Sequence, residues 1–518
     1  MRVCALRVRL AGRQECALIH ALRVLTNMPK NVEYIEAPIR SDCGKGRLVA
    51  ILPVSRAVFR YVATSALGTL VFPGAQRRMY WRWLNGFFSG YWEYRQGLRG
   101  EQSRAGVETK ASAEGARKLS IVFASHSPLG GPFVVGSHHL ARELARAGHA
   151  VAHVSVPISF GHVVRLHRPE TRIRFGVWLR GGKRCESGIF EYTPFTFFPW
   201  PLAVRSKGRS NLMLVTAPKI AKVLRRAGFS KIDFLLIDDP RFAGIERLLR
   251  PGTWAYRATD LYHQFPGRHD ITSAETLLAR GADILIATSK PVQDYLGTLA
   301  PGRSLHLIEN GVELARFAHR VSAPPEYQDL PKPRMVYVGA LDERLDPALL
   351  ERIAARFQQA SLVLIGPPTA SITRRLGHLP NVALLGAKDY GLVPAYLQHA
   401  DVALLPFSNH PANAGRSPMK LFEYAACGLP VVATHTSDLA RRSLEFLITA
   451  PTHEEFMAKL ESLLFDTKLR ENLGARARDA ARSMDWCSLA DRLVDLFWTV
   501  RAGESGSVRA LSTLEGAT

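Results

Sequence analysis

Short apolar runs alternate with amphipathic helical patterns along most of the chain from residue 119 onward. The first run, Leu119-Ser-Ile-Val-Phe-Ala-Ser125, is almost continuously apolar, as expected of a parallel strand that is covered on both faces. A glycine-containing loop at 127–131 follows, then a helical pattern that Gly148 closes, then a second apolar run at 151–155. This order predicts a strand, a helix and a parallel strand in one unit.

The alternation continues and then restarts after a proline-rich stretch. Further strands of the first part are predicted at 234–237, 254–256, 284–287 and 305–308. Residues 319–333 contain four prolines and few hydrophobic residues and predict a linker. Strands of the second part are predicted at 335–338, 362–365, 382–385, 402–405 and 431–433. We therefore expect an α/β protein with two doubly wound, Rossmann-like domains, 119–318 and 334–484, that face a cleft.

The two ends of the chain have other patterns. Apolar residues at helical spacing predict a last helix up to residue 500, and residues 501–518 predict a disordered tail. Residues 1–118 lack the alternation of strands and helices. An amphipathic helix is expected around Arg56 and Arg60, followed by aromatic residues interleaved with arginines at 77–95. This basic extension is either a membrane-proximal segment or the product of a mis-assigned start, with Met28 or Met79 as later starts.

Composition and charge limit the class of protein and of partner. Of the 518 residues 47% are hydrophobic and 22% are charged, which excludes disorder as the dominant state. The formal net charge is +23, and residues 1–118 supply about half of it, with 20 Lys and Arg against 8 Asp and Glu. A polyanionic partner is therefore expected: nucleic acid, an anionic membrane or a phosphorylated substrate. Arginines interrupt the longest apolar stretch, so we expect any membrane contact to be peripheral.

Cysteine spacing bears on metals and on the compartment. The six cysteines form no close pair and no metal-ligand spacing, so we expect reduced, cytosolic thiols and neither a disulfide nor a zinc framework. An Asp-x-Asp motif is also missing from the sequence, which disfavours a metal-bridged diphosphate site.

The most informative segment for chemistry runs from Arg416 to 430. Ser417 predicts an N-cap and Pro418 a first helical position, so the helix begins at the carboxyl edge of the preceding strand. There its free amides and dipole favour a phosphate. Lys420 in the first turn adds a cation, and Glu423, on the same face, could accept hydrogen bonds from two ribose hydroxyls. The alternative is a surface Lys–Glu pair on an ordinary capped helix.

This segment resembles the nucleotide-sugar motif of GT-B glycosyltransferases with a group 1, family-4-like C-terminal domain, and the resemblance covers about 119–500. The chain is most similar to the inverting, membrane-associated glucuronosyltransferase family of xanthan-type exopolysaccharide assembly. That family has Ser-Ser-His-Asp, Tyr-Arg-Ala-Ser-Asp and Ser-Met-Lys-Leu-Leu-Gln-Tyr. This chain has Ala124-Ser-His-Ser127, Tyr256-Arg-Ala-Thr-Asp260 and Pro418-Met-Lys-Leu-Phe-Glu-Tyr424. Retaining relatives usually carry a Glu at the position of Gly415.

The resemblance implies roles for individual residues. Asp260 would be the general base that takes the proton of the acceptor hydroxyl, and His126 would orient that hydroxyl or the base. Asp238 and Asp239 are rival bases. Asp260 has an alternative role as a helix cap, and His126 as a buried, satisfied histidine. The residues expected at the donor are Gly339, Arg416, Ser417, Met419, Lys420 and Glu423.

The resemblance also implies substrates and a location. The donor would be a UDP-sugar, with glucuronate as the family's sugar, and the acceptor a lipid-linked saccharide; no metal or other cofactor is expected. The enzyme would work in the cytoplasm, at the inner face of the plasma membrane. Ala387 and Phe407 replace a family acid and a family Tyr, which bears on donor identity. The helix at 485–500 would cross back to the N-terminal domain.

Other interpretations remain open from the sequence. The same fold could serve a retaining glycosyltransferase or a nucleotide-sugar epimerase. The charge alone would fit a non-enzymatic nucleic-acid-binding protein, although no nucleic-acid module is recognisable. The basic stretch 165–184 and the aromatic stretch 195–200 either dock on anionic lipid or form a solvated loop over an aromatic core edge.

Overall fold

The computed structural model describes residues 118–514 except 132–133, 164, 197, 201–210, 266–270 and 416. These residues all belong to one compact unit, residues 109–518. The expectations for residues 1–117 and for Arg416 lie outside the described residues.

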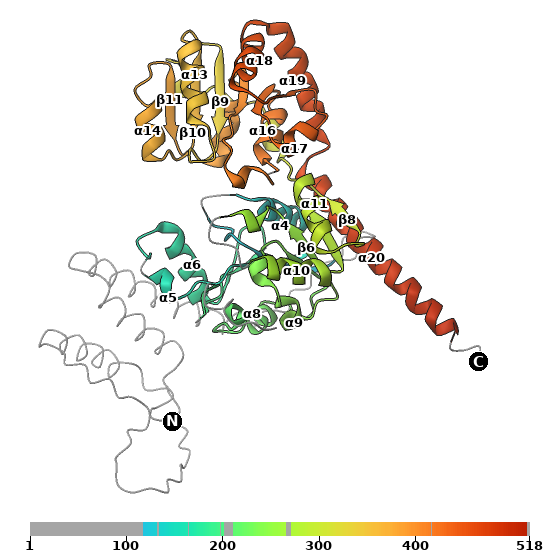
Figure 1. The fold of residues 1–518 in the computed structure, drawn as a ribbon. Helices are drawn as coiled ribbons and strands as arrows, with labels where there is room; N and C mark the ends of the chain where they lie inside the picture. The colour runs from blue at the N-terminus through green and yellow to red at the C-terminus, as the bar shows by residue number, and fades with distance from the viewer. Residues whose placement is uncertain are drawn as a thin grey trace, which may run out of the picture. The chain divides into compact units, whose positions relative to one another are not determined.

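The first sheet has eight strands in the order β3-β4-β2-β1-β5-β6-β7-β8. Figure 1 labels its strands β6 and β8. Neighbouring strands are parallel except β3 and β4, which are antiparallel. The order reverses between β1 and β5, which creates a topological switch point, and ligands of doubly wound sheets bind at such points. The strands are β1 Ser120–Ser125, β2 Ala150–Ser155, β3 Lys183–Arg184, β4 Phe190–Tyr192, β5 Phe234–Ile237, β6 Thr253–Ala258, β7 Ile284–Ala287 and β8 Leu305–Leu307.

The second sheet is entirely parallel and has the order β11-β10-β9-β12-β13-β14. Its switch point lies between β9 and β12. The strands are β9 Arg334–Val338, β10 Ser361–Ile365, β11 Val382–Gly386, β12 Val402–Leu405, β13 Val431–Thr434 and β14 Leu447–Ala450.

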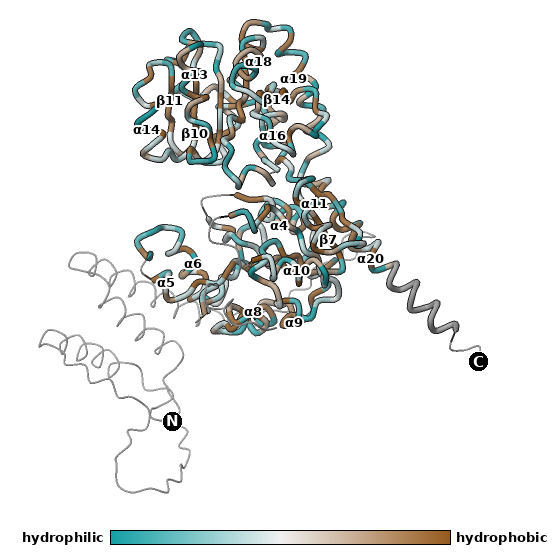
Figure 2. Tube along the Cα trace, in the orientation of Figure 1, coloured by the Kyte–Doolittle hydropathy of each residue, from teal (hydrophilic) through white to brown (hydrophobic). Residues whose placement is uncertain are grey.

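Helices connect the parallel strands and cover the sheets. In Figure 2 hydrophobic residues gather in the sheets, and polar residues gather in the outer turns. The helices of the first part are α4 Gly136–Arg146, α5 Phe160–Val163, α6 Pro169–Arg180, α8 Ile220–Arg226, α9 Ile245–Leu249, α10 Ile271–Gly281 and α11 Lys290–Leu299. Those that follow are α12 Leu314–Ala318, α13 Pro347–Arg356, α14 Ala370–Leu376, α15 Val393–Gln398, α16 Met419–Ala426, α17 Ser437–Arg441, α18 His453–Phe465, α19 Thr467–Arg482 and α20 Trp486–Leu514.

The apolar pattern located most strands, and those it missed are short. The predicted strands 234–237, 284–287 and 402–405 coincide with β5, β7 and β12. β3, β4 and β14 were not predicted, and they have two, three and four residues. In β4 a charged residue also interrupts the run: Glu191 is fully buried, and its Oε2 lies 3.6 Å from Lys183 Nζ.

The proline-rich connection between the sheets is packed against the second domain. Tyr327 is only 2% exposed and belongs to the core of that domain, as does Phe317 of α12. The Tyr327 hydroxyl donates a hydrogen bond to the Tyr396 carbonyl at 2.9 Å. The core of the second domain therefore includes residues that precede β9, although the sequence pattern predicts that this domain begins at β9.

The last helix packs on one face of the first sheet. Ile121 and Phe123 of β1 point to the core cluster that contains Trp486 and Phe497 of α20, whereas Val122 and Ala124 point to the opposite cluster. The sequence predicts a disordered tail from residue 501, whereas α20 extends to Leu514. Extending an existing helix adds a backbone hydrogen bond for each residue fixed, and this contribution does not depend on apolar periodicity.

Removing a buried ring of α20 should weaken the fold. Phe497 is 0% exposed and lies 5.0 Å from the ring of Phe234, so we expect Phe497→Ala to lower the free energy of unfolding by about 3–5 kcal/mol. Phe465→Ala is the matched control, because that ring is 74% exposed and its removal should change stability by about 0.5 kcal/mol at most. Urea unfolding measures both, and equal losses would contradict the packing of α20.

Candidate active site

A cleft of about 430 Å³ lies where the switch points of the two sheets face each other. From the first sheet it is lined by His126 after β1, Asp238 after β5 and Asp260 after β6. From the second sheet it is lined by Gly339 after β9 and by the first turns of α16. The residues from the sequence prediction that line it are His126, Asp260, Gly339, Ser417, Met419, Lys420 and Glu423.

The α16 helix begins one residue later than its sequence suggests. Pro418, not Ser417, is the N-cap residue, and no side chain caps the helix. The Ser417 hydroxyl instead lies 3.4 Å from both the Asn310 backbone nitrogen and Arg442 Nη2. The Ser417 hydroxyl, which the local sequence predicts as a helix cap, therefore interacts with residues that are distant in the chain. The first amides of α16 are left without a side-chain acceptor.

Lys420 reaches from α16 to the glycine turn after β9. Its Nζ lies 2.9 Å from the Tyr337 hydroxyl and 4.4 Å from the centre of the Tyr337 ring. Gly339 has φ of 146°, and a Cβ there would come within 2.4 Å of Lys420 Nζ. A Cβ on Gly366, after β10, would come within 1.8 Å of the Gly339 carbonyl oxygen. Both turns therefore require glycine, and their backbones can approach a ligand closely.

Glu423 lies deeper in the cleft and has one carboxylate oxygen already bonded. The Tyr390 hydroxyl donates to its Oε1 at 3.0 Å. Burial raises the pKa of Glu423 to about 7, against the hydrogen bond from Tyr390 and the charge of Lys420. Tyr390 was not predicted as a site residue, and no local pattern marks it, since it follows β11 and lies 33 positions before Glu423.

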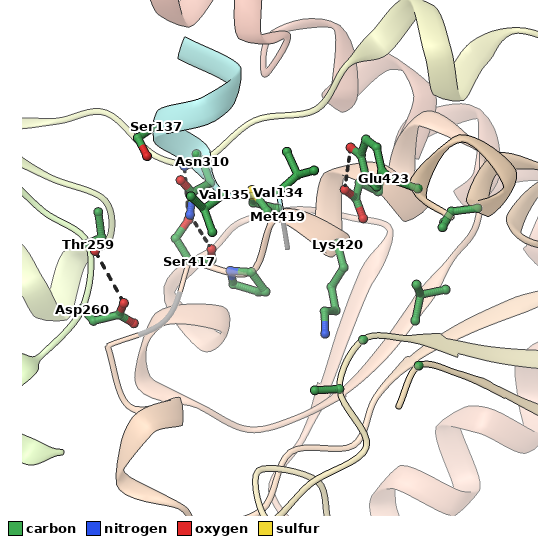
Figure 3. A pocket seen from close by; sticks show the side chains of 18 of the residues that line it. Val134, Val135, Ser137, Thr259, Asp260, Asn310, Ser417, Met419, Lys420 and Glu423 are labelled. Carbon is green, nitrogen blue, oxygen red and sulfur yellow. Dashed lines mark hydrogen bonds between the residues drawn. The ribbon is translucent and has the colours of Figure 1, made fainter. Parts of the chain in front are cut away.

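Asp260 faces the second sheet from the opposite wall. It follows β6, is partly exposed, and its Oδ2 lies 3.5 Å from Thr259 Oγ1. Figure 3 shows Asp260 and Lys420 pointing toward the same open space. The Tyr262 hydroxyl bonds Thr259 Oγ1 at 2.7 Å and the Asp238 carbonyl at 2.9 Å, so the Asp260 loop is anchored to the end of β5.

The two rival carboxylates have different environments. Asp239 forms an ion pair with Arg241, with Oδ2 2.6 Å from Nη2. Although burial works against the charged form, this pair holds the pKa of Asp239 below its usual value. Asp238 is 1% exposed and lines the cleft, and burial raises its pKa to about 6. The structure therefore leaves Asp238 as the rival of Asp260 and gives Asp239 a structural role.

A buried arginine joins the two walls of the cleft. Arg257 of β6 has Nη1 3.8 Å from Asp238 Oδ1, and its Nη2 donates to Asn310 Oδ1 at 3.0 Å. Asn310 Nδ2 in turn donates to the Ser417 carbonyl at 2.9 Å. Arg257 and Asn310 were not among the predicted site residues. Two sequence signals could have indicated these residues: Arg257 is a single arginine within an apolar strand, and Asn310 belongs to an Asn-Gly pair after β8.

The histidines near β1 divide into cleft and core residues. His126 lines the cleft. His138 and His139 are buried in α4, and the ring of His139 stacks on Trp486 with centroids 5.0 Å apart. Burial lowers the pKa of His138 to about 3, so it is neutral at physiological pH. In the described part of the chain no group of three His, Cys, Asp or Glu side chains is arranged to hold a metal ion.

Comparison with known families finds a match in the second domain. Residues 332–466 match the family model for glycosyl transferases group 1. A provisionally named teichuronic acid biosynthesis glycosyltransferase of Bacillus subtilis, TuaH, is 29% identical over 233 residues, which are 42% of this chain and 57% of that protein. A D-inositol 3-phosphate glycosyltransferase of Thermomonospora curvata is 27% identical over 39% of this chain and 51% of its own length. The chain thus spans little more than half the length of these curated relatives.

Solved structures share the whole two-domain fold. Sucrose-phosphate synthase from Thermosynechococcus elongatus superposes with a TM-score of 0.56 at 18% identity, over 75% of this chain and all of that chain. HepE from Anabaena, in complex with UDP, superposes with a TM-score of 0.52 at 16% identity, over 74% of this chain and all of that chain. The fold is GT-B, as predicted, and together with the group 1 match it supports a glycosyltransferase enzyme.

The raised pKa of Glu423 should make stability depend on pH. Below pH 4.5 the Glu423 carboxyl is protonated in both the folded and the unfolded chain. Between pH 4.5 and about 7 it loses its proton only in the unfolded chain. The free energy of unfolding therefore falls as the pH rises through this range. We expect the unfolding free energy of the natural protein, relative to Glu423→Gln, to fall by about 3 kcal/mol from pH 4.5 to pH 8. Glu471→Gln, at an exposed side chain of α19, is the control in these urea titrations. A difference that stays constant with pH would contradict the burial of the charge.

Proposed function

We propose that the protein is an inverting, metal-independent glycosyltransferase that transfers a sugar from a UDP-sugar to a hydroxyl group of an acceptor. The observation that carries the proposal is the facing of Asp260 from the first sheet and Lys420 and Glu423 from the second across one cleft. A donor held by its nucleotide on α16 would present its sugar toward Asp260.

The donor site combines three features that suit a nucleoside diphosphate. The first amides of α16 and Lys420 supply positive charge for the diphosphate. The glycine turns at Gly339 and Gly366 let the backbone approach it closely. Glu423 can accept ribose hydroxyls, with Tyr390 holding one oxygen in place. Complexes of HepE with UDP and with UDP-glucose support UDP as the nucleotide.

The reaction would proceed by a single displacement. The acceptor oxygen forms a bond to the anomeric carbon and gives its proton to the Asp260 carboxylate, while the bond from that carbon to the diphosphate oxygen breaks. Lys420 and the α16 amides stabilise the negative charge that develops on the departing UDP.

The position where retaining relatives carry a Glu supports inversion. A Cβ on Gly415 would come within 2.6 Å of Leu261 Cγ and 3.0 Å of the Leu261 backbone nitrogen. Leu261 directly follows Asp260, so the loop that presents the proposed base occupies the space of the missing side chain.

The surface near α5 and α6 supports the proposed lipid-linked acceptor and a location at a membrane surface. Three large apolar side chains are exposed there, Phe160, Ile173 and Phe198, and Arg165, Arg168 and Arg172 are exposed on the same segments. Apolar and basic side chains together suit the headgroup layer of an anionic membrane, which supports a lipid-linked saccharide as the acceptor. Phe195 of the aromatic stretch is instead buried against Trp178, 4.8 Å away. None of the described helices has both the length and the apolar composition to cross a bilayer.

Exchange of the proposed base should abolish transfer and spare donor binding. We expect Asp260→Asn to lower kcat by about 10²–10⁴-fold while the Kd for UDP changes little. Transfer is measured with UDP-glucuronate and other UDP-sugars on membrane lipid extract. Asp479→Asn, at a 71% exposed side chain, is the control. If Asp260→Asn kept full transfer activity and Asp238→Asn lost it, the base would be Asp238. Conversion of the sugar nucleotide in the absence of an acceptor would identify an epimerase.

The diphosphate contact can be tested by binding alone. Lys420→Gln should weaken UDP about tenfold or more, because a charge-assisted hydrogen bond to the diphosphate is lost. Lys388→Gln is the matched control: that lysine also lines the cleft, but its Nζ is paired with Glu326 Oε1 at 2.6 Å. Calorimetric titration should give the same Kd with and without EDTA. Loss of UDP binding in EDTA would overturn the metal-independent site.

A further inference from the structure

A second cavity of about 230 Å³ adjoins the cleft on the side of the first sheet. His126 lines both spaces, so the cavity opens beside the proposed reaction centre and away from the donor residues of α16. Its charged and polar walls come from Ser159, His162, Arg174 and Arg241, and Trp200 adds an aromatic wall.

Arg174 is the charged group of this cavity that forms no ion pair with any other described residue. Its Nη2 donates to the Val156 carbonyl at 2.5 Å, and its Nε has no hydrogen-bond partner. No carboxylate among the described residues lies within 4.0 Å of its guanidinium. Glu170, one turn earlier on α6, is exposed to solvent. Burial lowers the pKa of Arg174 to about 10, so the side chain is still charged at neutral pH.

The neighbouring groups do not neutralise Arg174. Arg241 is already paired with Asp239 through two parallel contacts, Nε to Oδ1 at 2.9 Å and Nη2 to Oδ2 at 2.6 Å. Burial and the nearby Arg174 lower the pKa of His162 to about 4, so it is neutral at physiological pH. Among the described residues, the positive charge of Arg174 in this partly desolvated cavity is attracted by the exposed Glu170 and has no ion-pair partner.

We infer that this cavity is an acceptor subsite that binds one anionic group of the acceptor, a sugar carboxylate or a phosphate, through Arg174. The inference rests on the proposed function, because the cavity adjoins the proposed base through His126. Its volume is below the roughly 300–1,000 Å³ of sites that enclose a whole small molecule, which suits a single charged unit of a longer acceptor. A planar guanidinium binds carboxylate and phosphate oxygens by charge-assisted hydrogen bonds.

Binding of three simple probes tests the subsite in the full chain. The probes are p-nitrophenyl glucoside, p-nitrophenyl glucuronide and glucose 1-phosphate, titrated by ligand-observed NMR with UDP present. We expect at least one anionic probe to bind about tenfold more tightly than the neutral glucoside. Preference for the glucuronide identifies a carboxylate, and preference for the phosphate identifies a phosphate group. Equal or weaker binding of both anions overturns the inference.

Variants of Arg174 show whether its side chain causes the preference for an anionic probe. Arg174→Gln should remove the preference for the anion, and Arg174→Lys, which keeps the charge, should retain part of it. Arg226→Gln is the control, because that residue is exposed on α8 of the same domain and has no role in the proposed sites. If Arg174→Gln does not fold, Arg174→Lys and the natural protein still decide the outcome. An anion preference that survives intact in folded Arg174→Gln overturns the assignment.

The result for the anion subsite can be distinguished from the result for the proposed function. UDP binding at Lys420 and sugar transfer to any acceptor are measured independently of the three probes. Transfer without anion preference refutes the subsite and leaves the glycosyltransferase intact. Anion binding at Arg174 without transfer supports the subsite and counts against the proposed reaction.

Discussion

The side-chain amide of Asn310 connects the two walls on which the site depends. Its Nδ2 donates to the Ser417 carbonyl at the start of α16, and its Oδ1 accepts from the buried Arg257 of the first sheet. A Cβ on Gly136 would come within 2.5 Å of that Oδ1. The start of α4 can therefore approach Asn310 this closely only because residue 136 is glycine. A buried guanidinium that lost this acceptor would carry a large desolvation cost, which makes the connection between the walls specific.

Two groups of opposite charge, Asp260 and Lys420, line the cleft from different domains. The carboxylate of Asp260 belongs to a loop anchored through Thr259 and Tyr262, whereas the Lys420 amine is held on the Tyr337 ring. Each group is fixed by its own sheet. The proposed donor, which carries a diphosphate at one end and a reacting carbon at the other, would therefore find prearranged partners, and prearrangement is the main electrostatic contribution to such reactions.

Burial gives the remaining ionisable groups of the first domain distinct roles. Asp239 and Arg241 neutralise each other, and His138 is held neutral. Against these satisfied neighbours, Arg174 stands out because its charge has no acidic partner within ion-pair distance among the described residues. An unbalanced charge in a cavity is costly unless a ligand completes it, and the proposed anionic acceptor would supply that completion.

The sequence by itself determined the layered α/β architecture, the positions of most strands and the pairing of Lys420 with Glu423 on one helix face. The strands follow from short, continuous apolar runs, and the helices and the shared face of Lys420 and Glu423 follow from a period of three to four residues, which local side-chain geometry imposes. Only the tertiary structure decided that Ser417 bonds Asn310 instead of capping α16, that Tyr390 holds Glu423, and that Asp239 is neutralised while Asp238 faces the cleft. Most of these outcomes join residues far apart in the chain, and all depend on burial, which only the packed structure sets.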